Sequence, residues 1–248
     1  MAAERVYGLH AVRALIGRRP GAVRRLLIQG GREDRRLGEI VKLAREHGIA
    51  VETRAADALD ELAAGGVHQG VVAEVEAAVA LSEDALLGAL GDRDGPPPLL
   101  LVLDGVQDPH NLGACLRSAD AVGVDFVVAP RDRATGLTPV VRKVAAGAAE
   151  SVAFVQVTNL ARTMRELKDL GVWFVGTSDT AAKTLYEADL GGPLGIVMGA
   201  EGQGLRRLTR ELCDLEVRLP MRGAVESLNV SVATGIVLYE ALRQRGLS

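Results

Sequence analysis

The spacing of apolar positions divides the chain into two parts with different predicted structures. In the first 76 residues, short strand-like runs alternate with apolar residues at helical spacing, which predicts a small α/β domain. The expected helices lie at 10–16, 37–44 and 57–62, and the expected strands at 25–28, 51–53 and 71–75.

From Leu99 onward, runs of Val, Leu, Ile and Phe alternate with helical patterns. Continuous apolar runs are typical of strands buried on both faces, so the sequence predicts a parallel α/β sheet covered by helices. One helix is expected to begin near Asn111 and to end at Gly123, because apolar residues between them recur every three or four positions. The six expected strands are PLLLVLD, DFVVA, SVAFVQV, VWFVGTS, GIVMG and DLEVRL.

Residues 77–98 separate these two parts and differ from both in composition. Ser82 is a candidate cap for a short helix that runs through Leu90, and the sequence GDRDGPPP follows. Three consecutive prolines neither continue a helix nor join a central strand. We therefore expect a linker at 77–98, stiff at its end, between a domain at 1–76 and a domain at 99–248.

Composition narrows the classes of function. A chain of 248 residues, of which 48% are apolar, can form one or two domains with a substantial core. No apolar stretch approaches the length of a membrane span, and the first residues do not resemble a signal peptide. Two distant cysteines and four histidines without metal-ligand spacing favour a reducing, cytoplasmic location and argue against a bound metal.

Charge is distributed unevenly along the chain. The net charge of −3 argues weakly against binding to nucleic acid, but residues 1–36 contain nine arginines and three acidic residues. This excess fits a local surface for a polyanion. The alternative is a solvated surface in a protein that uses arginine throughout, since only four of the 29 basic residues are lysine. Aromatic residues make up 3% of the chain, which argues against a base-stacking platform.

Three polar clusters follow predicted strands, at the edge where open parallel sheets bind ligands. The first contains Asn111 and Arg117, the second is a glycine-rich loop around Glu201, and the third contains Ser227 and Asn229. The glycine-rich loop lacks the dinucleotide and P-loop patterns, and its carboxylate suits a hydroxyl, an amine or a cation better than a pyrophosphate. Structural roles remain open at this point: Asn111 and Ser227 are candidate helix caps, and Arg117 is a candidate solvated side chain.

Taken together, the three clusters resemble the SpoU/TrmH branch of the SPOUT RNA methyltransferases. The three motifs of that branch are present as DPHNLGACLRSADAVG, IVMGAEGQGL and LPMRGAVESLNVSVATGIVLYE, at 108–123, 196–205 and 219–240. The first part of the chain, with VYGLHAV and HQGVVAEV, resembles the L30e-like RNA-binding domain of members that methylate a guanosine ribose in 23S ribosomal RNA.

The resemblance implies a catalytic domain whose C-terminal segment threads a deep trefoil knot, and a homodimer formed through the knot region. It implies S-adenosyl-L-methionine as cofactor and 2′-O-methylation of a guanosine in 23S ribosomal RNA. The catalytic residues implied by the resemblance are Asn111, Arg117, Glu201, Ser227 and Asn229. The implied cofactor-binding residues are Gly176, Thr177, Met198, Gly199, Leu219, Met221 and Leu228.

Two alternatives stay within the same fold: a methyltransferase that acts on transfer RNA ribose, and a non-catalytic RNA-binding or ribosome-assembly protein. Loss of Asn111, Arg117 or Asn229 would favour the non-catalytic protein, and all three are present. A nucleotide-dependent oxidoreductase is disfavoured, because the dinucleotide fingerprint is missing.

Overall fold

The computed structural model describes residues 4–32, 34–75 and 80–246. The chain divides into two compact units, residues 1–79 with 146–151 and residues 80–145 with 152–248. Residues 76–79, where the expected first domain ends and the expected linker begins, lie outside the described residues.

The first unit is built on a four-stranded sheet in the order β1-β4-β2-β3. β2 and β3 are parallel, and β4 is antiparallel to both of its neighbours. All expected helices and strands of this part are present, and β1 is additional, because its sequence ERVY is too short and polar to form a strand pattern. The elements are β1 (Glu4–Tyr7), α1 (Leu9–Arg18), a 3₁₀ turn (Pro20–Ala22), β2 (Val23–Gln29), α2 (Arg35–Glu46), β3 (Ala50–Arg54), α3 (Ala56–Leu62) and β4 (Val71–Val75).

Both faces of this sheet are covered by helices. Leu26 of β2 belongs to the buried cluster that includes Leu15 of α1 and Ile40 of α2. The next residue, Leu27, packs with Leu59 of α3 in a separate cluster. Because neighbouring side chains of a strand point to opposite faces, α3 lies on the face opposite α1 and α2.

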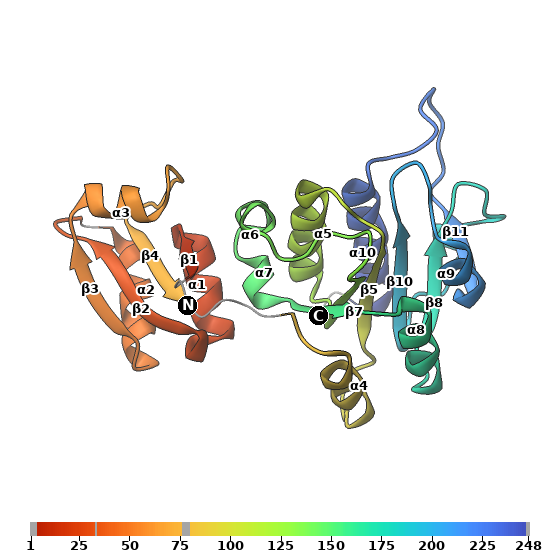
Figure 1. Cartoon of the computed structure of the whole chain (residues 1–248), viewed down its shortest axis with the longest axis horizontal. Coiled ribbons are helices and arrows are strands. Elements are labelled where there is room, and N and C mark those ends of the chain that lie inside the picture. Colours follow the sequence, from red (N-terminus) through yellow and green to blue (C-terminus); the bar gives the residue numbers. More distant parts are fainter. Residues whose placement is uncertain (1–3, 33, 76–79, 247–248) are drawn as a thin grey trace. The chain divides into compact units, whose positions relative to one another are not determined.

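The second unit is a seven-stranded sheet in the order β7-β6-β5-β10-β8-β11-β9, with helices on both sides (Figure 1). Every pair of neighbouring strands is parallel, as the continuous apolar runs predict. The two-residue strand β9 is additional to the six expected strands. The strands are β5 (Leu99–Asp104), β6 (Phe126–Pro130), β7 (Ala153–Val157), β8 (Trp173–Thr177), β9 (Lys183–Thr184), β10 (Leu194–Gly199) and β11 (Leu215–Arg218).

Two groups of helices pack around this sheet. Leu86 of α4 and Met164 of α8 share a buried cluster with Leu100 and Val102 of β5, and α9 packs against the same cluster. α5 packs against both α6 and α10, and α10 also contacts β10. No described helix has the length and apolar composition needed to cross a membrane. The helices of this unit are α4 (Glu83–Gly91), α5 (Pro109–Val122), α6 (Pro139–Ala145), α8 (Leu160–Asp169), α9 (Arg207–Leu212) and α10 (Val230–Arg245), with a 3₁₀ turn at Leu185–Glu187. The short helix α7 (Ala148–Ser151) belongs to the first unit, where it contacts α1.

Residues 80–98, within the expected linker, are ordered parts of the second unit. Ser82 caps α4, as expected, by accepting a hydrogen bond from the backbone N–H of Ala85.

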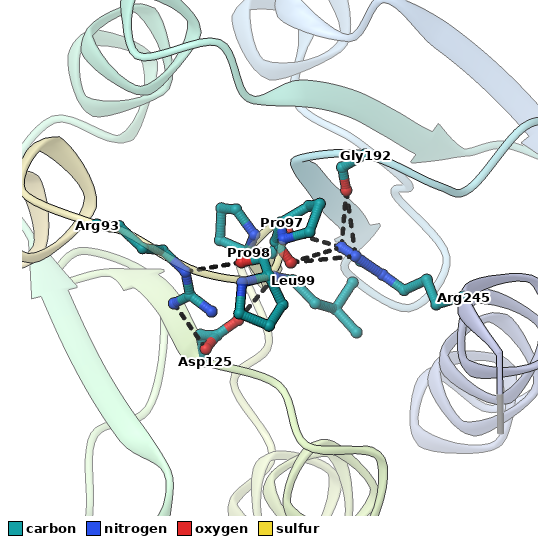
Figure 2. A network of polar contacts seen from close by, with 8 residues as sticks. Arg93, Pro97, Pro98, Leu99, Asp125, Gly192 and Arg245 are labelled. Carbon is teal, nitrogen blue, oxygen red and sulfur yellow. Dashed lines mark hydrogen bonds and ion pairs between the residues drawn. The ribbon is translucent and has the colours of Figure 1, made fainter. Parts of the chain in front are cut away.

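The proline segment is then held at both sides (Figure 2). Arg93 donates to Asp125 at 2.9 Å, and Asp125 accepts from the backbone N–H of Leu99 at 2.8 Å. On the other side, Arg245 at the end of α10 donates to the carbonyls of Pro98 and Gly192 at 2.9 and 2.7 Å. These contacts fix the entry into β5 against the last turn of α10.

Candidate active site

The three polar clusters meet at the carboxyl edge of the seven-stranded sheet. β5, β10 and β11 are parallel members of this sheet, and the segments that follow them carry Asn111, Glu201 and Asn229. Asn229 donates from Nδ2 to Asn111 Oδ1 at 2.9 Å and to Glu201 Oε1 at 2.8 Å. Asn111 donates from Nδ2 to the same Glu201 oxygen at 3.1 Å. Three residues that are up to 118 positions apart therefore form one closed hydrogen-bonded triangle.

Asn111 is held in the first turn of α5. The helix begins at Pro109, and its N-cap is Asp108, whose carboxylate accepts a hydrogen bond from the backbone N–H of His110 at 2.9 Å. This hydrogen bond lowers the pKa of Asp108 from its ordinary value. The interpretation of Asn111 as the cap is therefore wrong. Its buried amide group is free to bind Asn229 and Glu201 instead.

Glu201 is presented by a tight glycine loop. Ala200 and Gly204 exchange backbone hydrogen bonds at 3.2 and 2.9 Å, which closes the loop around Glu201. A Cβ atom at Gly199 would lie 2.2 Å from the backbone carbon of Gly204, so only glycine fits there. Gly202 and Gly204 adopt φ values of +72° and +66°, which favour glycine.

An ion pair with a buried carboxylate fixes the end of this loop. The fully buried carboxylate of Asp104, the last residue of β5, accepts from the backbone N–H of Arg206 at 2.9 Å and also pairs with its guanidinium. Arg206 directly precedes α9. The loop that carries Glu201 is thereby attached to the strand that leads into α5.

Asn229 uses its two amide atoms for different purposes. Its Oδ1 accepts from the backbone N–H of Ser231 at 2.9 Å and from the hydroxyl of Ser231 at 2.6 Å, and so caps α10. Its Nδ2 belongs to the triangle. The interpretation of Ser227 as the cap is therefore wrong, because the helix begins two residues later than that interpretation requires.

A pocket of about 510 Å³ lies beside the triangle, at the ends of β8, β10 and β11. Its wall combines apolar side chains with the glycine-rich loop and exposes the carboxylates of Asp179, Glu201 and Glu226. Of its two arginines, Arg210 pairs with Glu216 at 3.5 Å and Arg218 donates to the carbonyls of Ala181 and Ala182. The sequence-predicted residues in its wall are Thr177, Met198, Gly199, Glu201, Leu219, Met221, Ser227, Leu228 and Asn229.

Two predicted residues lie elsewhere. Gly176 is buried behind the pocket wall, where a Cβ atom would lie 2.7 Å from Cys213 Sγ and from Leu205 Cδ1. Arg117 is exposed on α5, six residues beyond Asn111, which is about 9 Å along the helix axis. Within the described residues no hydrogen bond or ion pair connects Arg117 to the triangle.

The sequence interpretation missed the Asp104–Arg206 pair and the role of Ser231 at the start of α10. Asp104 had a detectable signal, because it is a charged residue at the end of an otherwise apolar run. Its partner had no signal, since Arg206 is one of three arginines between residues 205 and 211 that the sequence does not distinguish. The described part of the chain contains no group of three or more histidine, cysteine or acidic side chains that could hold a metal ion.

Comparison with known proteins places this arrangement in a family. Residues 98–239 match the model of the SpoU rRNA Methylase family. The chain belongs to the SpoU rRNA methylase family. Residues 5–79 match a second model, described as RNA 2′-O ribose methyltransferase substrate binding.

Several curated relatives match this chain over nearly the whole length of both sequences. The chain is 55% identical over 240 residues to the 23S rRNA (guanosine-2′-O-)-methyltransferase RlmB of Shewanella oneidensis, with 97% of each chain covered. It is 56% identical to RlmB of Pseudomonas syringae pv. tomato, covering 98% of this chain and 96% of that one. It is 51% identical to RlmB of Escherichia coli K12, covering 98% and 99%.

Two solved structures of SpoU proteins share the fold of this chain, one over nearly its whole length and the other over about two thirds of it. The SpoU methyltransferase AviRb from Streptomyces viridochromogenes, solved in complex with the cofactor AdoMet, aligns with a TM-score of 0.75 at 25% identity, covering 97% of this chain and 89% of that chain. The A. aeolicus TrmH/SpoU tRNA modifying enzyme aligns over 65% of this chain and 83% of its own, with a TM-score of 0.55 and 32% identity.

Proposed function

We propose that this protein transfers a methyl group from S-adenosyl-L-methionine to the ribose 2′-oxygen of a guanosine in 23S ribosomal RNA. The observation that carries the proposal is the Asn111–Glu201–Asn229 triangle beside the pocket, in a member of the SpoU rRNA methylase family. The RlmB relatives at 51–56% identity act on 23S rRNA according to their names, and this sets the substrate class.

The pocket fits the cofactor in size and in charge. Its volume of about 510 Å³ lies within the range of small-molecule sites. Leu219, Met221 and Leu228 supply apolar surface for an adenosine, and the carboxylates of Glu201 and Glu226 suit a ligand that carries a sulfonium and an ammonium group. S-adenosyl-L-methionine supplies a methyl group that its sulfonium already activates, so the chain itself has to align the acceptor and handle its proton.

The triangle supplies this alignment. Glu201 Oε1 is held by two amide donors, which leaves the carboxylate oriented to accept a hydrogen bond from a ribose hydroxyl. Ser227 stands in the pocket wall next to this group and can bind the same ribose. The 2′-hydroxyl is the group that distinguishes RNA from DNA, so a site that binds it selects RNA.

We assign Arg117 to stabilising the developing alkoxide or a nearby phosphate of the RNA. Guanidinium groups stay protonated in proteins, which makes arginine a poor base and a good electrostatic stabiliser. Arg117 lies outside the triangle of its own chain, so we propose that it acts in the site of the partner subunit of a homodimer.

The homodimer is supported by an exposed apolar stripe on α10. Val232, Ile236 and Tyr239 recur at helical spacing and are 51%, 36% and 54% exposed. They follow Asn229 on the same helix, so a second chain packed on this stripe comes close to the triangle. An Ile236→Arg/Tyr239→Arg variant is expected to sediment as a monomer, and an unchanged sedimentation coefficient would contradict this interface.

We also propose that the C-terminal segment threads a trefoil knot and that the first unit is an L30e-like domain that binds the RNA substrate. The strand order supports the knot, because β10 lies between β5 and β8 while β11 lies beyond β8. The match of residues 5–79 to the substrate-binding model supports the role of the first unit. A ribosomal RNA substrate supports a location in the cytoplasm, where ribosomes assemble.

Methyl transfer from labelled S-adenosyl-L-methionine to unmodified 23S ribosomal RNA tests the function, with transfer RNA as the second substrate. We expect label in a single guanosine 2′-O-methyl group of the 23S RNA. Label in transfer RNA alone would contradict the proposed substrate and identify transfer RNA in its place. No label in either RNA would overturn the assignment as an enzyme. Arg117→Ala is expected to abolish transfer and to leave the affinity for the cofactor, measured by calorimetry, nearly unchanged.

A further inference from the structure

The loop after β6 brings two arginines to the edge of the sheet that carries the triangle. β6 is the neighbour of β5 on the side away from β10, and Arg131 and Arg133 follow its last residue, Pro130. A Cβ atom at Gly105 would lie 3.7 Å from the backbone oxygen of Arg133 and 3.6 Å from Ala200 Cβ. The loop therefore stands next to the loop that holds Glu201.

The backbone of this loop is anchored while its charged side chains are exposed. The N–H of Arg131 donates to the carbonyl of Val157 at 2.9 Å, and the N–H of Thr135 donates to the carbonyl of Val106 at 3.0 Å. Arg131 and Arg133 are both exposed, and among the described residues no carboxylate forms an ion pair with either guanidinium. Arg133 also has a φ of +56°, a conformation in which glycine would be less strained. An arginine at such a position suggests that its side chain is needed there.

The N-terminal arginines that dominate the charge pattern of the sequence are bound differently. Arg25 pairs with Glu74 at 2.7 Å and with Glu52 at 3.0 Å, and these hydrogen bonds raise its pKa. Arg32 and Arg35 each pair with a carboxylate at 3.3 Å. Part of the positive charge of residues 1–36 is thus neutralised within the chain, whereas that of Arg131 and Arg133 is available to a ligand.

The triangle has a different neighbour on each side. The pocket occupies the ends of β8, β10 and β11, and the arginine loop occupies the end of β6. A ligand that fills the pocket leaves the side of β6 open for the second substrate. From this placement we propose that Arg131 and Arg133 bind the phosphate backbone of the RNA next to the target ribose. The inference rests on the proposed function, since it identifies where that substrate enters.

Single substitutions separate charge from loop structure. Arg133→Gly removes the charge and relieves the backbone, so a loss of RNA affinity in this variant does not come from strain. Arg133→Lys restores the charge. Asp132→Asn removes a negative charge from the same exposed loop and should act in the opposite direction. Arg165→Ala removes one exposed arginine from α8 and is the matched control.

The test is binding of unmodified 23S ribosomal RNA to the full chain, measured without cofactor over a series of salt concentrations. Arg131→Ala and Arg133→Gly are each expected to raise the Kd several-fold. Each should also make the negative slope of the logarithm of the RNA association constant against log salt shallower by about 0.7–0.9. Arg133→Lys should keep the wild-type slope, Asp132→Asn should tighten binding, and the affinity for S-adenosyl-L-methionine should not change. If Arg131→Ala and Arg133→Gly match Arg165→Ala in Kd and slope, the inference is overturned.

Failure of the inference and failure of the proposed function give different results. A wild-type protein that methylates 23S RNA while its loop variants bind RNA normally contradicts only the role of the loop. A wild-type protein that binds RNA through the loop and methylates no RNA contradicts only the proposed reaction.

Discussion

At the scale of single residues, Asn229 joins the stability of a helix to the geometry of the site. Its Oδ1 caps α10, and its Nδ2 connects Asn111 with Glu201. A structural interpretation and a functional interpretation of the same residue are therefore both correct, at different atoms. Substitutions that keep one atom's role and remove the other can separate them.

Asn229→Ser is expected to retain the cap and to lose the bridge, because serine caps helices as well as asparagine but has no amide to donate. Its free energy of unfolding should stay close to that of the wild type, while methyl transfer falls by roughly 100-fold through misplacement of Asn111 and Glu201. Asn229→Ala should lose the same activity and, in addition, about 1 kcal/mol of stability. Urea unfolding and single-turnover transfer rates measure the two effects, and an active Asn229→Ser variant would contradict the role of the triangle.

At the scale of elements, the ion pair of Asp104 and Arg206 holds the glycine loop between β5 and α9. The Asp104 side chain is fully buried, and Arg206 is 40% exposed. Removing the cation that pairs with a buried carboxylate strongly lowers the free energy of unfolding, whereas an exposed ion pair contributes little to it. The neighbouring Arg207 offers the exposed case, because it pairs with Glu211 at 2.8 Å on the surface of α9.

Arg206→Ala is expected to lower the free energy of unfolding by about 3 kcal/mol, since it leaves the Asp104 carboxylate buried without its cation. Arg207→Ala removes the same side chain one position later and should cost only about 0.3–0.5 kcal/mol. Chemical denaturation of both variants checks the difference. Equal losses in the two would show that Asp104 is not held by Arg206.

The last helix contains a pH-sensitive interaction of its own. Hydrogen bonds from Arg243 and Gln244 lower the pKa of Glu240 to about 2, and Gln244 also donates to the carbonyl of Ala188. Because the pKa in the folded protein lies below the ordinary value of about 4.3, the stabilisation is present above pH 5 and is lost as the pH falls towards 2. Glu240→Gln should therefore lose less stability than the wild type between pH 5 and pH 3, as measured by urea midpoints. Parallel losses would contradict this role of Glu240.

The strands, loops and helix caps of the second unit differ in how far the sequence predicts them. The strands from β5 to β11 follow from continuous apolar runs, but β9 has two residues and gives no pattern. The glycine loop around Glu201 follows from three glycines near a strand end. Which side chain caps a helix does not follow, because Asp108 and Asn111, or Ser227 and Asn229, are equally good caps by type and differ only in where the helix begins. The separation of Arg117 from the triangle likewise depends on where α5 begins and on which turn of it carries Arg117, which residue type does not determine.

At the scale of the whole molecule, the chain folds into two units with separate hydrophobic cores. The described residues that line the pocket all lie between Thr177 and Ala233 and belong to the second unit. The first unit has its own buried clusters on both faces of its sheet. Binding of the cofactor should therefore depend on the second unit, and part of the affinity for RNA on the first.

Deletion of residues 1–79 is expected to change the cofactor affinity by no more than about 0.5 kcal/mol, roughly twofold, as for independent sites. RNA binding should weaken, and its salt slope should become shallower by about 0.7–0.9 for each phosphate that the first unit neutralises in the full chain. Because Arg25, Arg32 and Arg35 are paired with carboxylates, the change in slope should be well below the value that all nine N-terminal arginines together would give. Calorimetry measures the cofactor affinity, and RNA titrations at several salt concentrations measure the RNA affinity and its salt slope. Circular dichroism confirms that the shortened chain is folded. An unchanged slope would show that the N-terminal arginines form only a solvated surface.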